Sequence, residues 1–121
     1  MSTFLTPGKH MKIITLAEVP TQGVSHDPEI QKRVMLRNDD LPHLTNFSQA
    51  RFVPGQQVTP HKHVDMSEVF LVESGEGTIW INHVAYPLIA GTCVAVEAGE
   101  LHKLANTGQT DLVLTYFGIL V

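Results

Sequence analysis

Three histidines and one glutamate have the residue types and the spacing that could perform chemistry in this sequence: His61, His63, Glu68 and His102. His61 and His63 stand two residues apart at the end of a segment that reads as a strand. Because side chains alternate between the two faces of a strand, both imidazoles should project to the same side. A turn over residues 64–67 would then return the chain, so that Glu68 begins the next strand beside them. The local pattern thus predicts two imidazoles and one carboxylate around one point.

Two histidines and a carboxylate form a donor set that suits iron, manganese, nickel, cobalt, copper or zinc as a divalent ion. An isolated His-x-His pair on a strand is nevertheless more often a surface or packing feature than a metal site. A second segment, residues 91–106, changes this balance because it places His102 at the mouth of a later predicted hairpin. Together the two segments favour a site for one divalent transition metal ion.

Both segments resemble the sequence motifs of the cupin superfamily. The first matches the first cupin motif at every fixed position, and the second matches the second motif at all but one. The matching residues are Gly55, His61, His63, Glu68 and Gly75 in the first segment, and Gly91, Gly99, His102 and Asn106 in the second. The resemblance covers about Phe47 to Phe117. It implies a small all-β protein with the cupin-type double-stranded β-helix (jelly roll) barrel. It also implies that His61, His63, Glu68 and His102 bind the metal.

The one departure from the second motif is Glu97, which stands where cupins usually have proline. Glu100 follows three residues later at the same predicted mouth. We favour the interpretation that both are solvated loop carboxylates. The alternative is that one of them steers a cationic group or accepts a proton near the metal.

The chain from Leu44 onward consists of short runs rich in Val, Ile, Thr and Phe, broken by Gly, Pro or Asn, which is typical of an all-β sandwich or barrel. Asn82-His83 is expected to form a two-residue hairpin turn that exposes His83, because Asn tolerates a positive φ. The predicted strands are Asn46–Val53, Val58–His63, Glu68–Glu73, Gly77–Ile81, Val84–Ile89, Thr92–Val96, His102–Ala105 and Asp111–Gly118.

Residues 1–45 are expected to form an N-terminal extension whose strands could pack on the barrel of residues 46–121 or on a partner subunit, within one domain overall. Ile13–Leu16 and Val34–Leu36 could be strands, and Asp27-Pro28-Glu29 could open a short helix with proline at its first position. Met11 is a second plausible start, which would make Ser2–His10 a loose extension.

Composition narrows the classes of partner and location. A net charge of −4 argues against nucleic acid, which normally requires a basic face. Cys93 is the only cysteine, so no intramolecular disulfide can form, and we expect it to be a small buried residue.

No apolar run approaches the ~20 residues needed to span a bilayer, and the start lacks a signal-peptide pattern. We therefore expect a cytoplasmic protein, and a homodimer because a mean hydropathy of +0.05 is high for a small chain.

Side chains near the first motif are expected to shape the pocket. Phe70 and Val72 share the face of Glu68 by alternation and should line the barrel beneath the site. Arg51 would be a natural clamp for a carboxylate if it pointed inward, but alternation makes the Ala50 and Phe52 face at least as good a candidate. Further aromatic candidates, whose orientation the sequence does not give, are Trp80, Tyr116 and Phe117.

Three classes of function are compatible with these residues. We favour a metal-dependent enzyme, such as an oxygenase, isomerase or decarboxylase, that acts on a small oxygen-rich anionic molecule. The reason is that three neutral imidazoles and one carboxylate leave a net positive charge on a divalent metal. The alternative is a non-catalytic module that binds or senses a small sugar-like or organic-acid ligand. A structural barrel without a ligand is the third class. No catalytic residue is identified by the sequence.

Overall fold

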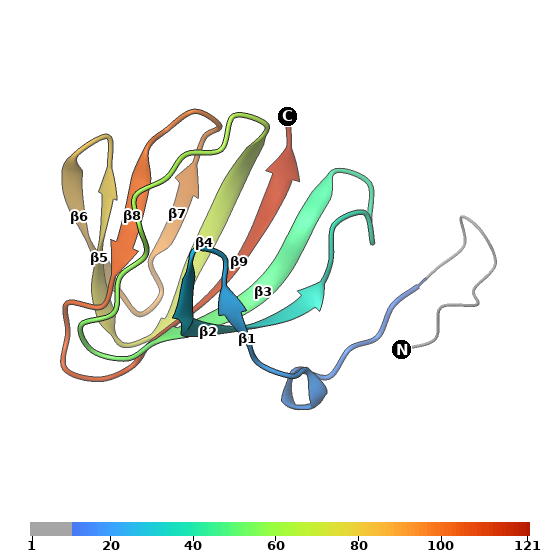
Figure 1. Ribbon diagram of the computed structural model, residues 1–121, viewed down its shortest axis with the longest axis horizontal. Coiled ribbons are helices and arrows are strands. Elements are labelled where there is room, and N and C mark those ends of the chain that lie inside the picture. Colours follow the sequence, from blue (N-terminus) through green and yellow to red (C-terminus); the bar gives the residue numbers. More distant parts are fainter. Residues whose placement is uncertain (1–10) are drawn as a thin grey trace.

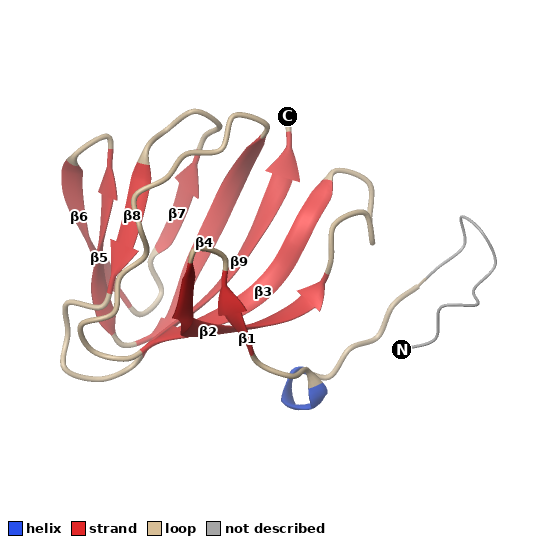
Figure 2. Ribbon diagram, viewed as in Figure 1, coloured by secondary structure: helices blue, strands red, loops and turns tan. Residues whose placement is uncertain are grey.

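The computed structural model describes residues 11–121, so the extension predicted for Ser2–His10 lies outside the described residues. Within this range the chain forms strands and one short 3₁₀ turn, η1 (Leu16–Glu18) (Figure 2). The strands are β1 (Gln22–Val24), β2 (Asp27–Leu36), β3 (Leu44–Phe52), β4 (Met66–Ser74), β5 (Glu76–Ile81), β6 (Val84–Ile89), β7 (Cys93–Val96), β8 (His102–Ala105) and β9 (Leu112–Leu120). The predicted all-β class is confirmed. No helix in residues 11–121 is long and apolar enough to cross a membrane.

The strands assemble into two antiparallel sheets with jelly-roll topology (Figure 1). The larger sheet has six strands in the order β1-β2-β3-β9-β4-β7, and the smaller sheet has the order β6-β5-β8. The last strand, β9, lies between β3 and β4 and pairs with both along most of its length. Strands distant in sequence are thus brought together on one surface, which faces the smaller sheet.

One apolar cluster fills the space between the sheets. Its residues alternate along the strands with residues that face outward. Ala50 and Phe52 of β3 are buried, whereas Arg51 between them points outward and pairs with Asp111 at 3.0 Å. The smaller sheet contributes Ile79, Leu88 and Leu104 to the same cluster. Burial of these side chains is the main favourable term holding the two sheets together.

The hairpin between β5 and β6 confirms the predicted turn. Asn82 and His83 have φ angles of 50° and 72°, and Ile81 pairs with Val84 across them. Two consecutive positive φ angles match the right-handed twist of the flanking strands. His83 is exposed, as expected.

The prediction of a strand over Val58–His63 is wrong. Only isolated bridges connect this segment to β8, at Gln57–Ala105 and His61–His102. The ladder is interrupted because the Thr59 N–H donates to the side chain of Asp27 and because Pro60 has no N–H to donate. The segment is therefore an extended loop that touches β8 at two points.

Two predictions for the N-terminal third are also wrong, while a third is confirmed. Asp27-Pro28-Glu29 begins β2 instead of a helix, since the Asp27 carboxylate is engaged by Thr59 and the following residues alternate between faces. Ile13–Leu16 is irregular and leads into η1. Val34–Leu36 is the end of the ten-residue β2.

Cys93 is exposed, contrary to the expectation of a buried residue. Val94 and Val96 of β7 face inward, so alternation turns Cys93 outward. It lies there beside the half-exposed Leu71.

The central role of the apolar cluster can be tested with two isoleucines of the smaller sheet. Ile79 is 0% exposed and Ile89 is 59% exposed. Ile79→Ala should lower the free energy of unfolding by about 2–5 kcal/mol, because it removes buried surface and leaves a cavity. Ile89→Ala should change it by about 0.5 kcal/mol or less. Urea unfolding of both variants measures this, and equal effects would contradict the assigned core.

Candidate metal centre

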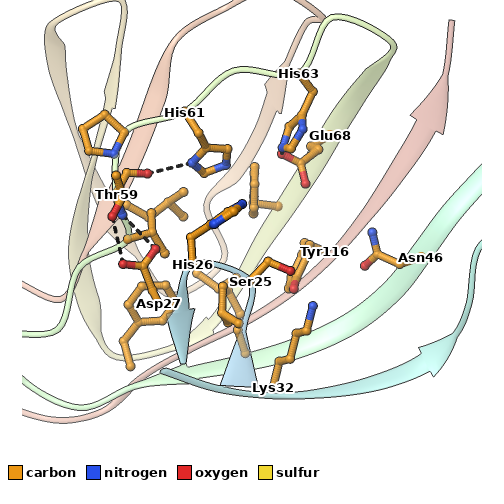
Figure 3. A pocket seen from close by; sticks show the side chains of 18 of the residues that line it. Ser25, His26, Asp27, Lys32, Asn46, Thr59, His61, His63, Glu68 and Tyr116 are labelled. Atoms are coloured by element: carbon orange, nitrogen blue, oxygen red, sulfur yellow. Dashed lines mark hydrogen bonds and ion pairs between the residues drawn. The ribbon is translucent and has the colours of Figure 1, made fainter. Parts of the chain in front are cut away.

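Four side chains from three parts of the fold meet at the open end of the two sheets. Figure 3 shows three of them, His61, His63 and Glu68. His61 and His63 come from the loop between β3 and β4, Glu68 lies in β4, and His102 is the first residue of β8. One ligand atom from each lies within 4.8 Å of those from the others. The structure therefore brings together all four residues that the sequence singled out, in a group that could hold a metal ion.

The backbone and two carbonyls orient the imidazoles. The His61 N–H donates to the His102 carbonyl at 3.0 Å, and the His102 N–H donates to the His61 carbonyl at 2.8 Å. His61 Nδ1 lies 2.8 Å from the Thr59 carbonyl, and His102 Nδ1 lies 3.0 Å from the Glu100 carbonyl. A carbonyl only accepts, so each Nδ1 carries a proton. Nε2 of a neutral His61 ring then keeps its lone pair, whereas His102 Nε2 faces the Glu68 carboxylate and donates to it when no metal ion takes the place of that proton. A proton on Nδ1 leaves Nε2 as the ring nitrogen that can bind a metal ion.

Glu68 faces these rings from a buried position. Its Oε1 lies 3.1 Å from His102 Nε2 and 3.5 Å from His63 Nε2, and Glu68 and His102 are 7% and 2% exposed. A carboxylate oxygen opposite an imidazole lone pair is repulsive unless a cation or a proton lies between them. The donor set therefore fits a divalent metal, which would satisfy the carboxylate and the imidazoles at once.

The pKa shifts of two histidines have different causes. Burial lowers the pKa of His61, against an opposing effect of its hydrogen bond to Thr59. Burial alone would also lower the pKa of His102, but the hydrogen bond to Glu68, the Glu100 carbonyl and the charges of both carboxylates together raise it. The raised pKa of His102 shows how strongly this corner of the site attracts positive charge.

A cavity of about 510 Å³ opens in front of His61, His63 and Glu68. Its opposite rim is the turn between β1 and β2, with Ser25, His26 and Asp27 (Figure 3). Its floor is largely apolar, with side chains of both sheets: Phe52, Phe70, Leu104 and Leu114. Apolar walls with a few polar groups are typical of small-molecule sites.

Comparison with known proteins assigns the family. Residues 48–118 match the cupin domain family. The chain belongs to the cupins. It is 36% identical over 66 residues to the oxalate-binding protein of Thermotoga maritima, a match that covers 54% of each chain. It is 29% identical over 70 residues to auxin-binding protein 1 of Arabidopsis thaliana, over 50% of this chain and 35% of that one. The matches thus span about half and about a third of the curated relatives.

Solved cupin structures agree with the fold. A Thermotoga maritima protein described as a predicted oxalate decarboxylase superposes with a TM-score of 0.84 at 26% identity, over 91% of this chain and 100% of that chain. KdgF from Halomonas sp. superposes with a TM-score of 0.76 at 20% identity, over 91% and 94% of the two chains, and shows the same fold.

The structure shows which of the residues that the sequence suggested for the pocket line the cavity. Phe70 lines the cavity as predicted, and Tyr116 and Phe52 line it too. Val72 shares their face but is 1% exposed and lies in the core below the cavity. Three other candidates lie elsewhere: Arg51 on the outer face, Trp80 beneath the Lys103 ammonium and Phe117 against Phe47.

Glu97 does not line the cupin cavity, and neither does Glu100. Glu97 is exposed, and its backbone N–H donates to Glu100 Oε1 at 2.9 Å. Glu100 also accepts a hydrogen bond from the Asn82 side chain at 3.3 Å. The Glu100 carboxylate thus closes the loop before His102, an arrangement that proline at position 97 would remove.

Sequence reasoning missed the cavity residues contributed by the N-terminal third, namely Ser25, His26, Asp27 and Lys32. For Lys32 a signal existed: it stands between Ile30 and Val34 in an alternating pattern, so a charged residue occupies an inward position. For the turn residues there was none, because their place depends on how β1 and β2 fold over the mouth.

Asp27 fixes the loop that carries His61. Its Oδ2 accepts the Thr59 N–H at 2.9 Å, and its Oδ1 accepts the Thr59 hydroxyl at 3.0 Å. The backbone carbonyl of Thr59 in turn accepts a hydrogen bond from His61 Nδ1. Asp27 therefore orients His61 through Thr59 from the far rim of the cavity.

Replacing Asp27 tests this connection. Asp27→Asn keeps the size of the side chain but leaves one oxygen to accept two hydrogen bonds, so the Thr59 peptide should loosen. We expect about tenfold weaker binding of Mn²⁺ to the four-residue cluster, the loss typical when an outer partner of a ligand is removed. Titration with Mn²⁺ followed by electron paramagnetic resonance measures it.

The matched control is Glu29→Gln in the same strand. The Glu29 carboxylate makes no hydrogen bond or ion pair with any residue in the described range, so Mn²⁺ affinity should not change. Equal losses in both variants would mean that net charge, and not the Thr59 contact, is responsible.

Proposed function

We propose that His61, His63, Glu68 and His102 bind one divalent transition metal ion, and that this cupin uses the ion to bind a small oxygen-rich anion. The observation that carries the proposal is the convergence of three imidazoles on a buried carboxylate, with Nδ1 of His61 and of His102 each beside a backbone carbonyl so that Nε2 is left for a metal ion. The metal would supply a Lewis acid with a net positive charge, which favours an anionic oxygen ligand.

The names of two relatives support an organic acid as the ligand. One is an oxalate-binding protein, and the other is described as a predicted oxalate decarboxylase. The cavity agrees with this class, because it combines an apolar floor with polar groups at the cluster and on the opposite rim. The same cavity is larger than a two-carbon acid needs, so oxalate itself is one member of the class to be tested.

Metal content tests the first half of the proposal. Wild-type protein should contain close to one metal ion per chain by plasma mass spectrometry, and Glu68→Gln and His102→Ala should lose it. His83→Ala is the matched control, because His83 is exposed in the β5–β6 turn and outside the cluster. Wild-type protein that stays metal-free after reconstitution would contradict the proposal.

Anion binding tests the second half. Oxalate at one hundred times its dissociation constant should stabilise the metal-loaded protein by about 2.7 kcal/mol, since a ligand that binds only the folded state shifts unfolding by mass action. Protein stripped of metal should show no such shift. Equal stabilisation with and without metal would place the anion elsewhere.

A catalytic role is the second candidate, favoured by ionisable groups on the cavity wall. His26 stands at the rim, and Tyr116 stacks on Phe70 with ring centroids 5.6 Å apart. Burial raises the pKa of Tyr116 to about 12, so its phenol keeps its proton at neutral pH and can donate a hydrogen bond. Consumption of oxygen, release of carbon dioxide or isomerisation of an organic acid by the metal-loaded protein would establish an enzyme.

A homodimer and a cytoplasmic location belong to the same proposal. The edge strand β6 leaves Val84, Tyr86 and Ile89 about half exposed, which is apolar surface that a second copy would cover. Light scattering during size-exclusion chromatography should give twice the mass of one chain. A monomer at micromolar concentration would rule the dimer out.

A further inference from the structure

Lys32 occupies an inward position on β2. Ile30 and Val34, two residues to either side, are 0% and 9% exposed and face the core. Lys32 is paired with the buried Ala50 of the neighbouring strand β3. Its stem therefore crosses the apolar inner face of the six-stranded sheet, and its ammonium reaches the cavity from the side opposite His61 and His63 (Figure 3).

The Lys32 ammonium makes no ion pair or hydrogen bond with any residue in the range 11–121. Asp27 is the other carboxylate that lines this cavity besides Glu68, and both of its oxygens are engaged by Thr59. Burial lowers the pKa of Lys32, the charge of Arg37 adds to this, and Glu68 opposes it. Half-burying a cation is unfavourable, and no carboxylate within the described residues forms an ion pair with Lys32, so only the longer-range attraction of Glu68 offsets its burial.

A metal ion in the cluster makes this position more unfavourable still. Lys32 is close enough to Glu68 for the two charges to interact, so its ammonium would repel a divalent ion bound there. Lysine in this place lowers metal affinity and stability together. An anion that spans the cavity would remove both penalties, because it would lie between the two positive charges.

We propose that Lys32 binds a second anionic group of the ligand, so that the ligand is a short-chain 2-hydroxy- or 2-keto-dicarboxylate with one end at the cluster and the other at Lys32. This inference rests on the proposed function, since the first end needs the metal. The charges match, because a dication with one carboxylate and three neutral imidazoles has one net positive charge and Lys32 has another. Tyr116, also on this wall, adds a neutral hydrogen-bond donor.

The experiment compares acids that share the chelating end and differ at the other. Mn²⁺-loaded protein, freed of unbound metal, is titrated calorimetrically with lactate, malate and 2-hydroxyglutarate. Malate or 2-hydroxyglutarate should bind wild-type protein at least about tenfold more tightly than lactate, as one charge-assisted hydrogen bond predicts. Lys32→Met should abolish this preference, leave lactate affinity within about threefold of wild type and retain the metal.

Two further variants separate charge from structure. Lys32→Arg keeps the cation and should keep most of the preference for the diacid. Arg33→Met removes one positive charge from the adjacent residue, which points to the other face of β2, and should leave the preference unchanged. Thermal unfolding of each variant, recorded beside the titrations, shows that the fold is retained.

The results that overturn the inference differ from those that overturn the proposed function. Equal affinities of wild type for lactate and both diacids, or a loss of the preference in Arg33→Met as large as in Lys32→Met, would refute the role of Lys32. Metal content and metal-dependent oxalate binding would be untouched by that outcome. Failure of wild type to retain Mn²⁺ would refute both proposals.

Discussion

The two backbone hydrogen bonds between His61 and His102 are the contact on which the candidate centre depends. They join the loop after β3 to the first residue of β8, and thus the first motif to the second. Because the two residues are directly paired across this antiparallel bridge, the His61 and His102 rings lie side by side with centroids 4.4 Å apart. Glu68 needs only its regular place in β4 to complete the group.

The remaining motif residues support the loops around this contact. Asn106 is 2% exposed, and its side-chain amide donates to the carbonyls of Phe52 at 2.9 Å and Thr110 at 2.8 Å. Its side-chain oxygen Oδ1 accepts the Gly108 N–H at 2.9 Å. Gly75 has a φ of 86°, and a Cβ there would meet the Asp111 carbonyl oxygen at 2.2 Å. These positions are constrained by backbone contacts and not by chemistry at the centre.

The mouth of the cavity combines two unequal halves. The cupin motifs supply an acceptor-rich half that attracts positive charge, with His102 and Glu68 at its centre. The strands β1 and β2 supply the other half. It contains the ammonium of Lys32 and the carboxylate of Asp27, which accepts a hydrogen bond from the Thr59 N–H. The match to the cupin domain family covers residues 48–118, so Asp27 and Lys32 are cavity residues that lie outside it. Ligand selectivity is therefore best sought in the N-terminal third.

The sequence by itself determined the all-β class, the strands from β3 to β9, the Asn82-His83 turn and the grouping of His61, His63, Glu68 and His102. Alternation and turn preferences are local properties, so they can be read along the chain, whereas His102 was added to the group through the resemblance to the second cupin motif. Only the tertiary structure decided what lies opposite that group and which segments keep their ladder. Asp27 takes the Thr59 N–H away from a predicted strand, and Lys32 faces the cavity because β2 pairs with β3. Both depend on contacts between residues far apart in sequence, which no local pattern records.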